Sequence, residues 1–221
     1  MIVTSPISHR RTVAALLLLT FATGLVDAIS VLMLGRVFVA NMTGNAIFLG
    51  FVFVPRTGFD LTGAAVAVGG FLAGVILGGR LVRRFGHRPR MWVTTALAVE
   101  VTLLVVLAAL TGAQVLRYAD NTKLILTAGL AVAFGLQNST ARQFGIQELY
   151  TTVLTSTIVG IGVDSRLAGG TGRRAKLRYG VVATMIAGAV VGATLTRYFV
   201  APIIALAAAV IAASLLLFRY G

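Results

Sequence analysis

Long apolar segments recur along the whole chain, and basic residues separate several of them. Eight such segments can be drawn: 12–34, 37–54, 61–82, 91–111, 123–141, 149–163, 179–197 and 200–218. A helix needs about 20 consecutive apolar residues to cross the hydrocarbon core of a bilayer. Six of the segments reach that length or come close to it. The pattern therefore predicts an all-α, polytopic membrane protein with a single transmembrane domain over residues 1–221.

The composition excludes a soluble globular fold. Of the 221 residues, 58% are hydrophobic and only 11% are charged, and the mean hydropathy is +0.96. Six acidic and nineteen basic residues are too few to cover a soluble domain of this length. We therefore expect the lipid bilayer to be the main partner of the chain.

The net charge of +13 does not indicate nucleic-acid binding, because the basic residues flank apolar segments. Lys and Arg at such positions set membrane topology and contact anionic headgroups. Two clusters are prominent, RLVRRFGHRPR at 80–90 and DSRLAGGTGRRAKLR at 164–178. The positive-inside rule places both in the cytoplasm, together with the N-terminus, which carries Arg10 and Arg11.

These basic regions limit how many segments cross the membrane. Three apolar segments separate the N-terminus from the first cluster, and three more separate the two clusters. Three crossings would place basic regions on opposite sides. The conflict disappears if 37–54 and 149–163, which polar residues interrupt, do not cross. We predict six transmembrane helices and two broken or re-entrant segments, with both termini in the cytoplasm. The N-terminal apolar run is interpreted as an uncleaved first span.

A weak internal repeat supports this topology. GLVDAISV at 24–31 precedes MTGN at 42–45, and GLQNSTAR at 135–142 precedes LTST at 154–157. In each half, a segment with small residues four apart follows, which is typical of close helix packing.

The repeat halves are 12–111 and 123–218, and the predicted topology makes them enter the membrane from opposite sides. Inverted repeats place interrupted helices near the midplane, where half-helix ends and unwound backbone bind solutes or ions. The two polar segments are therefore expected to face a polar cavity.

Polar side chains near these interruptions are the candidate substrate-binding residues. They are Asp27, Asn41, Thr43, Asn45, Gln137, Asn138, Thr155 and Thr157. Amides and hydroxyls supply both donors and acceptors, which suits a small polar solute or an ion. The alternative is structural, with hydroxyls bonded to their own helix carbonyls and amides bridging helices.

Two carboxyl groups lie within apolar segments, Asp27 in the first and Glu100 in the fourth. A carboxylate at membrane depth is costly unless it is paired, hydrated or protonated. Both are candidates for proton or cation coupling. Alternatively, Asp27 hydrogen-bonds to the neighbouring polar segment, and Glu100 is protonated or pairs with an Arg across a subunit contact.

No pattern in the chain indicates an enzyme, a cofactor or a metal site. Cysteine is absent, and both histidines, His9 and His87, lie in basic flanks. Neither GxSxG nor HExxH occurs.

The stretches GLVDAISVLMLGRVFVANMTGN, GLQNSTAR and TTVLTSTIVGIG together resemble the YoaK-type family of bacterial inner-membrane proteins of unknown function. The resemblance implies a multi-pass protein of the bacterial inner membrane and supplies no substrate. Residues 78–90 are also loosely similar to a loop motif of major facilitator transporters, with Arg83 in place of the acid. This loop is either a remote transporter signal or simply a basic turn.

The leading hypothesis is a small transporter or permease for a small polar solute or ion, with proton coupling through Asp27. A small-ion channel and a non-transporting scaffold or assembly protein are the alternatives. Six spans make a small permeation unit, so a homodimer is also predicted.

Overall fold

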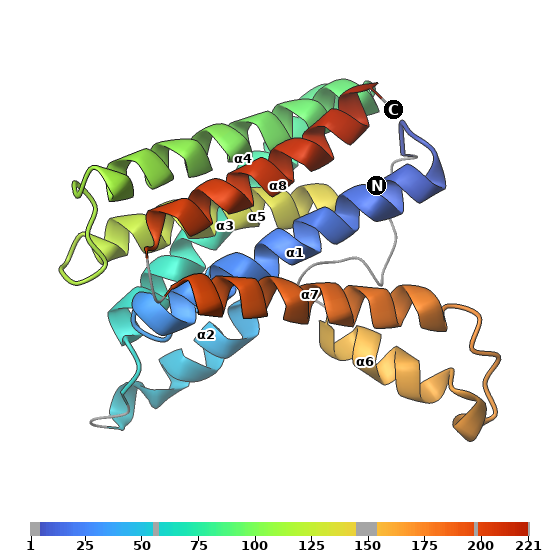
Figure 1. Ribbon diagram of the computed structural model, residues 1–221, viewed down its shortest axis with the longest axis horizontal. Helices are drawn as coiled ribbons and strands as arrows, with labels where there is room; N and C mark the ends of the chain where they lie inside the picture. The colour runs from blue at the N-terminus through green and yellow to red at the C-terminus, as the bar shows by residue number, and fades with distance from the viewer. Residues whose placement is uncertain (1–4, 55–57, 145–153, 197–198, 221) are drawn as a thin grey trace.

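The computed structural model describes residues 5–54, 58–144, 154–196 and 199–220, which form a bundle of helices (Figure 1). Six helices are long and apolar enough to cross a membrane: α1 (His9–Met33), α3 (Leu61–Phe85), α4 (Pro89–Gly112), α5 (Lys123–Arg142), α7 (Ala175–Leu195) and α8 (Ala201–Tyr220). Two short helices occupy the polar segments: α2 (Met42–Leu49) and α6 (Leu154–Val163). Strands are absent from these ranges. The predicted all-α fold, with six spans and two interrupted segments, is confirmed.

Two long helices reach farther into the basic clusters than the apolar pattern indicated. α3 continues to Phe85 and α7 begins at Ala175, so that residues 86–88 and 164–174 form the connections. Arg and Lys are good helix formers, and their long side chains reach water from a helix end. The next helix, α4, starts with Pro89, whose fixed φ suits the first helical position.

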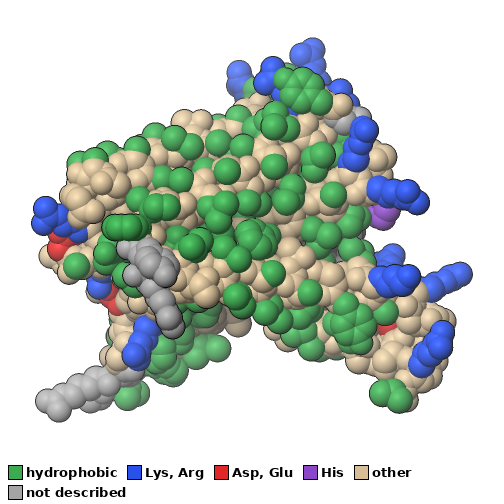
Figure 2. Space-filling model, viewed as in Figure 1, with side chains coloured by type: hydrophobic (Ala, Val, Ile, Leu, Met, Phe, Trp, Pro, Cys, Tyr) green, Lys and Arg blue, Asp and Glu red, His purple; other side chains and the backbone are tan. Residues whose placement is uncertain are grey.

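Helices α1 and α5 form the centre of the bundle and are the most buried of the six. α1 packs against α7 and α8, whereas α5 packs against α3 and α4, and α4 also packs on α8. Figure 1 shows that α1 and α5 run in opposite directions. Both termini lie at one end of the bundle, and Figure 2 shows Lys and Arg gathered there. We call this the basic end.

The helix pairs α1–α7 and α5–α3 come into contact at glycines. A Cβ at Gly24 of α1 would overlap a backbone carbonyl of α7, and one at Gly188 of α7 would overlap a carbonyl of α1. In the same way, Gly135 of α5 and Gly74 of α3 each lie against a carbonyl of the other helix. Only glycine lets two backbones approach so closely. Gly24 and Gly135 begin the GLVD and GLQN stretches, so matching sequence positions make matching contacts.

The segment that contains α2 enters the bundle and returns to the same end. The amide of Asp60, just before α3, donates to the carbonyl oxygen of Gly35, just after α1, at 3.1 Å. The chain therefore leaves α1 and enters α3 at neighbouring points, and α2 runs outward from the interior (Figure 1). This geometry is what a segment that does not cross would have, so non-crossing of 37–54 stays a prediction.

Helix α6 runs from the interior towards the basic end, where α7 begins (Figure 1). The guanidinium of Arg178 in α7 donates to the carbonyl oxygen of Gly160 at 2.6 Å and to the carboxylate of Asp164 at 2.5 Å. These bonds hold the end of α6 against the start of α7. Residues 149–153 of the predicted segment 149–163 lie outside the described residues.

At the end opposite the basic end, Asp60 joins three helices. Its carboxylate accepts from the amide of Gly63 at 2.8 Å, capping α3, and pairs with Lys123 of α5 at 2.8 Å. Partial burial alone would raise the pKa of Asp60, but the hydrogen bonds from Lys123 and Gly63 outweigh it and lower the pKa. This ion pair connects the first half of the chain to the second.

Candidate functional site

The carboxylate of Asp27 anchors the chain that leads into α2. One oxygen accepts hydrogen bonds from the amides of Val39 and Ala40, both at 2.9 Å, and the other accepts from the side-chain amide of Asn41. Asp27 is only 5% exposed and lies six residues before the end of α1. Six residues span about 9 Å of helix, so α2 starts at about that depth. The carboxylate thus offsets the cost of unpaired backbone there.

The predicted MTGN stretch contains residues with three different roles. Asn45 is fully buried, accepts from the amide of Phe38 at 2.9 Å and donates to its carbonyl oxygen at 2.6 Å. Gly44 leaves room for the Phe38 ring, which a Cβ there would meet at 2.5 Å. Thr43 is exposed on α2. Asn45 and Gly44 therefore hold the turn together.

The first turn of α6 repeats this arrangement of exposure. Thr155, the second residue of α6, is exposed like Thr43, the second residue of α2. Thr157, the fourth residue of α6, is buried like Asn45, the fourth residue of α2. The MTGN and LTST stretches thus occupy equivalent helical turns.

The beginnings of the two short helices line one cavity of about 410 Å³. Asn41, the residue just before α2, and Leu154, the first residue of α6, border it, and Phe38, α1 and α7 form the rest of the wall. The lining residues are Gly24, Asp27, Ala28, Val31, Phe38, Asn41, Leu154, Met185 and Ala189. Both helices turn their N-terminal ends, which carry partial positive charge, towards a space that contains one carboxylate.

Gln137 and Asn138 do not border this cavity. Gln137 is fully buried between α5 and α1, where its amide donates to the hydroxyl of Thr23 at 2.9 Å. Asn138 donates to the carbonyl oxygen of Phe134 on its own helix at 2.9 Å. Thr23 lies one helical turn from Asp27, so Gln137 connects the two central helices beside the cavity.

Glu100 lies in the interior of the bundle, away from the short helices. Its side chain is fully buried, and neither carboxyl oxygen has a hydrogen-bond partner among the described residues. Gln137 Oε1 and Ser214 Oγ are likewise buried without a partner in those ranges.

These three groups lie at one level of the bundle. α4 packs antiparallel to α8 and to α5 (Figure 1), with Gly112 beside Ala201 and Leu107 beside Gly129. Counting twelve residues along each helix from the Gly112–Ala201 contact leads to Glu100 on α4 and to the residue next to Ser214 on α8. Counting seven residues from the Leu107–Gly129 contact leads to Glu100 on α4 and to the residue next to Gln137 on α5. The interior therefore has a polar layer with unused hydrogen-bonding capacity.

The structure thus divides the residues predicted from sequence into separate groups. Asp27 and Asn41 line the α2–α6 cavity, and Asn45 stabilises the turn beside it. Thr43 and Thr155 are exposed, whereas Gln137 and Glu100 belong to the polar layer.

Sequence reasoning missed the apolar part of the cavity wall, which includes Phe38, Met185 and Ala189. Apolar residues in a membrane helix carry no signal that separates a cavity wall from a lipid-facing or packed surface. The sequence shows that position 24 is a glycine, but it does not show that this glycine packs against α7.

The chain matches the family described as a protein of unknown function (DUF1275) over residues 15–217. It is also 34% identical over 160 residues to the UPF0700 transmembrane protein YoaK of Bacillus subtilis strain 168. That similarity covers 71% of this chain and 68% of the relative. No solved structure matches the chain.

Proposed function

The chain is a multi-pass membrane protein that belongs to the DUF1275 family of unknown function, and we propose that it is a small transporter or permease. Its solute is a small polar molecule or an ion, bound where α2 and α6 begin. The observation that carries this proposal is the cavity of about 410 Å³ shared by Asp27, Asn41 and the first residue of α6. A volume of this size lies within the usual range of small-molecule pockets.

Two interrupted helices that meet inside a bundle are typical of transporter binding sites. Irregular backbone is tolerated at membrane depth where protein buries it or where it lines a wet cavity. The matching glycine contacts of α1–α7 and α5–α3 support two inverted repeats, α1–α4 and α5–α8. Movement of one repeat against the other would open the cavity to alternate sides.

The basic end is proposed to face the cytoplasm of the bacterial inner membrane, since it carries both Arg-rich connections. Asp27 is proposed as the group that responds to a proton or cation. Its protonation would weaken the bonds to Val39, Ala40 and Asn41, and would release the start of α2. Glu100, whose carboxyl oxygens have no hydrogen-bond partner among the described residues, is proposed as a second coupling group within the polar layer.

A non-transporting scaffold is the second candidate. Asp27 and Asn45 use their polar atoms in bonds that hold the α2 turn together, and such bonds also serve a purely structural role. A scaffold would keep the cavity dry, whereas a transporter must admit water from at least one side. Water accessibility therefore separates the two candidates.

Cysteine labelling tests accessibility, because the chain contains no native cysteine. Ala189→Cys places a thiol in the cavity wall, and Ala187→Cys places one on the exposed face of α7 outside it. We expect a membrane-impermeant thiosulfonate to modify Ala189→Cys and to leave Ala187→Cys unmodified. If neither cysteine reacts from either side, the scaffold is favoured and transport through this cavity is excluded.

Transport is measured on the full chain in proteoliposomes by solid-supported-membrane electrophysiology. The probes are pH jumps, Na⁺, K⁺, Cl⁻ and a panel of amino acids and polyols. We expect Asp27→Asn to abolish any wild-type current. The exchange variant Asp27→Asn/Asn41→Asp, which keeps one carboxylate and one amide at the cavity, should restore part of it. Full wild-type currents in Asp27→Asn would refute the site.

A further inference from the structure

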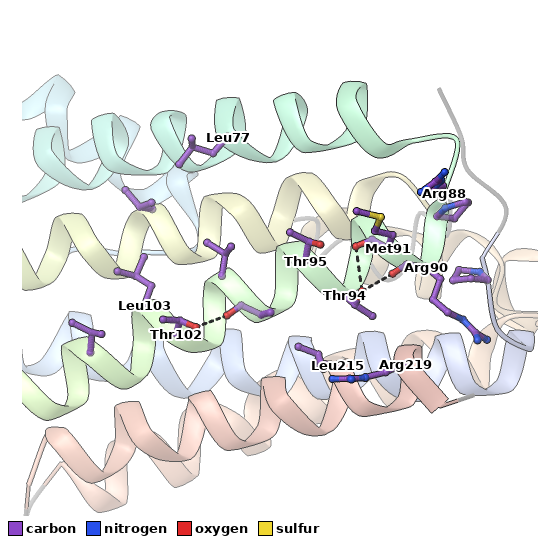
Figure 3. A pocket seen from close by; sticks show the side chains of 16 residues that line it. Leu77, Arg88, Arg90, Met91, Thr94, Thr95, Thr102, Leu103, Leu215 and Arg219 are labelled. Carbon is purple, nitrogen blue, oxygen red and sulfur yellow. Dashed lines mark hydrogen bonds between the residues drawn. The ribbon is translucent and has the colours of Figure 1, made fainter.

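A second cavity, larger than the first, lies on the outer surface of the bundle at the basic end. It has a volume of about 1270 Å³ and follows α4, with Leu77 of α3 on one side and Leu215 of α8 on the other (Figure 3), and Val132 of α5 also lines it. We propose that this groove, here the α4 groove, binds one anionic phospholipid. The proposal is independent of transport.

The wall of the α4 groove suits acyl chains. Most of its lining is apolar, including Met91, Val99 and Leu103. Two of its threonines satisfy their hydroxyls within α4, because Thr94 donates to the carbonyl oxygen of Arg90 at 2.8 Å and Thr102 to that of Ala98 at 2.9 Å (Figure 3). These hydroxyls therefore do not need water, and the groove can be filled by hydrocarbon.

The rim of the groove suits an anionic headgroup. Arg88 and Arg90 at the start of α4 and Arg219 in the last turn of α8 line the same end, and all three are exposed (Figure 3). Within the described parts of the chain, no carboxylate lines the groove and none of the three arginines forms an ion pair. Guanidinium groups bind phosphate oxygens through paired hydrogen bonds.

The length of the groove also fits a lipid. From Met91 to Val106, the lining of the groove on α4 rises by about 22 Å, which is enough to hold acyl chains that cross one leaflet of bilayer hydrocarbon, about 15 Å thick. A headgroup at the arginines would therefore place its acyl chains along the apolar wall. The three arginines lie where a headgroup would lie, at the basic end of the helices.

Charge argues against a second copy of the chain as the occupant. Two copies in one membrane share the same orientation, so a twofold axis along the membrane normal would place both sets of arginines at the same depth. Like charges would then face each other across the interface without a counterion. A phospholipid phosphate supplies the missing negative charge.

Native mass spectrometry of the detergent-purified full chain tests the proposal, with phosphatidylglycerol and phosphatidylcholine as probes. We expect one tightly bound phosphatidylglycerol and weaker phosphatidylcholine binding. Arg90→Gln/Arg219→Gln should weaken phosphatidylglycerol binding by about fivefold per arginine, or about 25-fold together. The control Arg166→Gln/Arg173→Gln removes the same charge from the connection between α6 and α7, outside the groove, and should change it less than twofold.

A second pair of variants tests the apolar wall with all arginines kept. Ala98→Trp fills the groove, whereas Ala187→Trp adds the same side chain on the exposed face of α7. We expect only Ala98→Trp to displace the lipid. The proposal would be overturned if the groove variant Arg90→Gln/Arg219→Gln and the control Arg166→Gln/Arg173→Gln lost phosphatidylglycerol binding equally. Unchanged phosphatidylglycerol binding in Ala98→Trp would overturn it as well. A wild-type dimer that Ala98→Trp dissociates, with no preference for phosphatidylglycerol, would assign the groove to a second copy instead.

Discussion

Replacing Gly188 by alanine tests the close approach of α7 to α1. The new Cβ would overlap the carbonyl oxygen of Phe21, so the helices must separate. Gly180 lies on the same helix with nothing within 4 Å of its Cβ position, and Gly180→Ala is therefore the matched control. We expect Gly188→Ala to destabilise the protein and Gly180→Ala to stabilise it.

The magnitude follows from two opposing effects. Alanine in place of glycine favours a helix by about 1 kcal/mol where space is open. Overpacking at a tight contact costs about 1–3 kcal/mol. Both variants gain the helix propensity of alanine, so the difference between their stabilities equals the overpacking cost at position 188. In a chain of this length, each kcal/mol changes the melting temperature by about 2–4 °C. Gly188→Ala should therefore melt about 2–12 °C below Gly180→Ala.

The assay is thermal unfolding of the purified protein in one detergent, followed by circular dichroism and by size-exclusion chromatography. A parallel pair on α3 extends it: Gly74 lies against the carbonyl oxygen of Val132, and Gly69 has open space. Gly74→Ala and Gly69→Ala should differ as much as the α7 pair does. Equal melting of Gly188→Ala and Gly180→Ala would refute the tight contact. A large difference on α7 with none on α3 would refute the equivalence of the two helix pairs.

Three further predictions concern polar side chains. Asn45→Ala should destabilise the α2 turn by about 1–3 kcal/mol, because both backbone groups of Phe38 lose their partner; faster amide exchange around α2 would show it, and unchanged exchange would contradict it. Asp60 has a lowered pKa, so its stabilisation is complete above the ordinary pKa and is lost as pH falls through the lowered value. In Lys123→Met the pKa of Asp60 should return toward its ordinary value, so this loss at acid pH should become smaller, with a cost near pH 7 of about 1 kcal/mol or less, measured as melting temperature against pH. Glu100→Leu should raise stability by about 1–3 kcal/mol, because it removes two buried oxygens that have no partner in the described part of the chain; a fall in melting temperature would indicate that these oxygens are bonded.

The number of crossings was predictable because hydrophobic length and the position of basic residues both act locally. A helix spans the bilayer only with enough apolar residues, and Arg-rich connections resist translocation. Counting basic regions predicted 37–54 as a segment that does not cross, and the bond between Asp60 and Gly35 brings the flanks of that segment together at one end.

The roles of the individual polar residues were not predictable in the same way. The sequence predicts both Asp27 and Asn41 as solute ligands, and the structure shows them bonded to each other at the edge of a cavity. Gln137 was placed in the same set, yet it bonds to Thr23 in the centre of the bundle. A polar residue in an apolar helix shows that a partner is needed, and the sequence does not say which helix supplies it.

The sequence by itself therefore determined the fold class, the six spans, the two interrupted segments and the basic end, because these depend on the transfer of local stretches between water and lipid. Only the tertiary structure decided that α1 pairs with α7 and α5 with α3, and that α2 and α6 begin at one cavity. It also decided that the α4 groove brings arginines from two helices together. These features depend on helix packing between residues far apart in the chain, where shape and backbone approach select the partner.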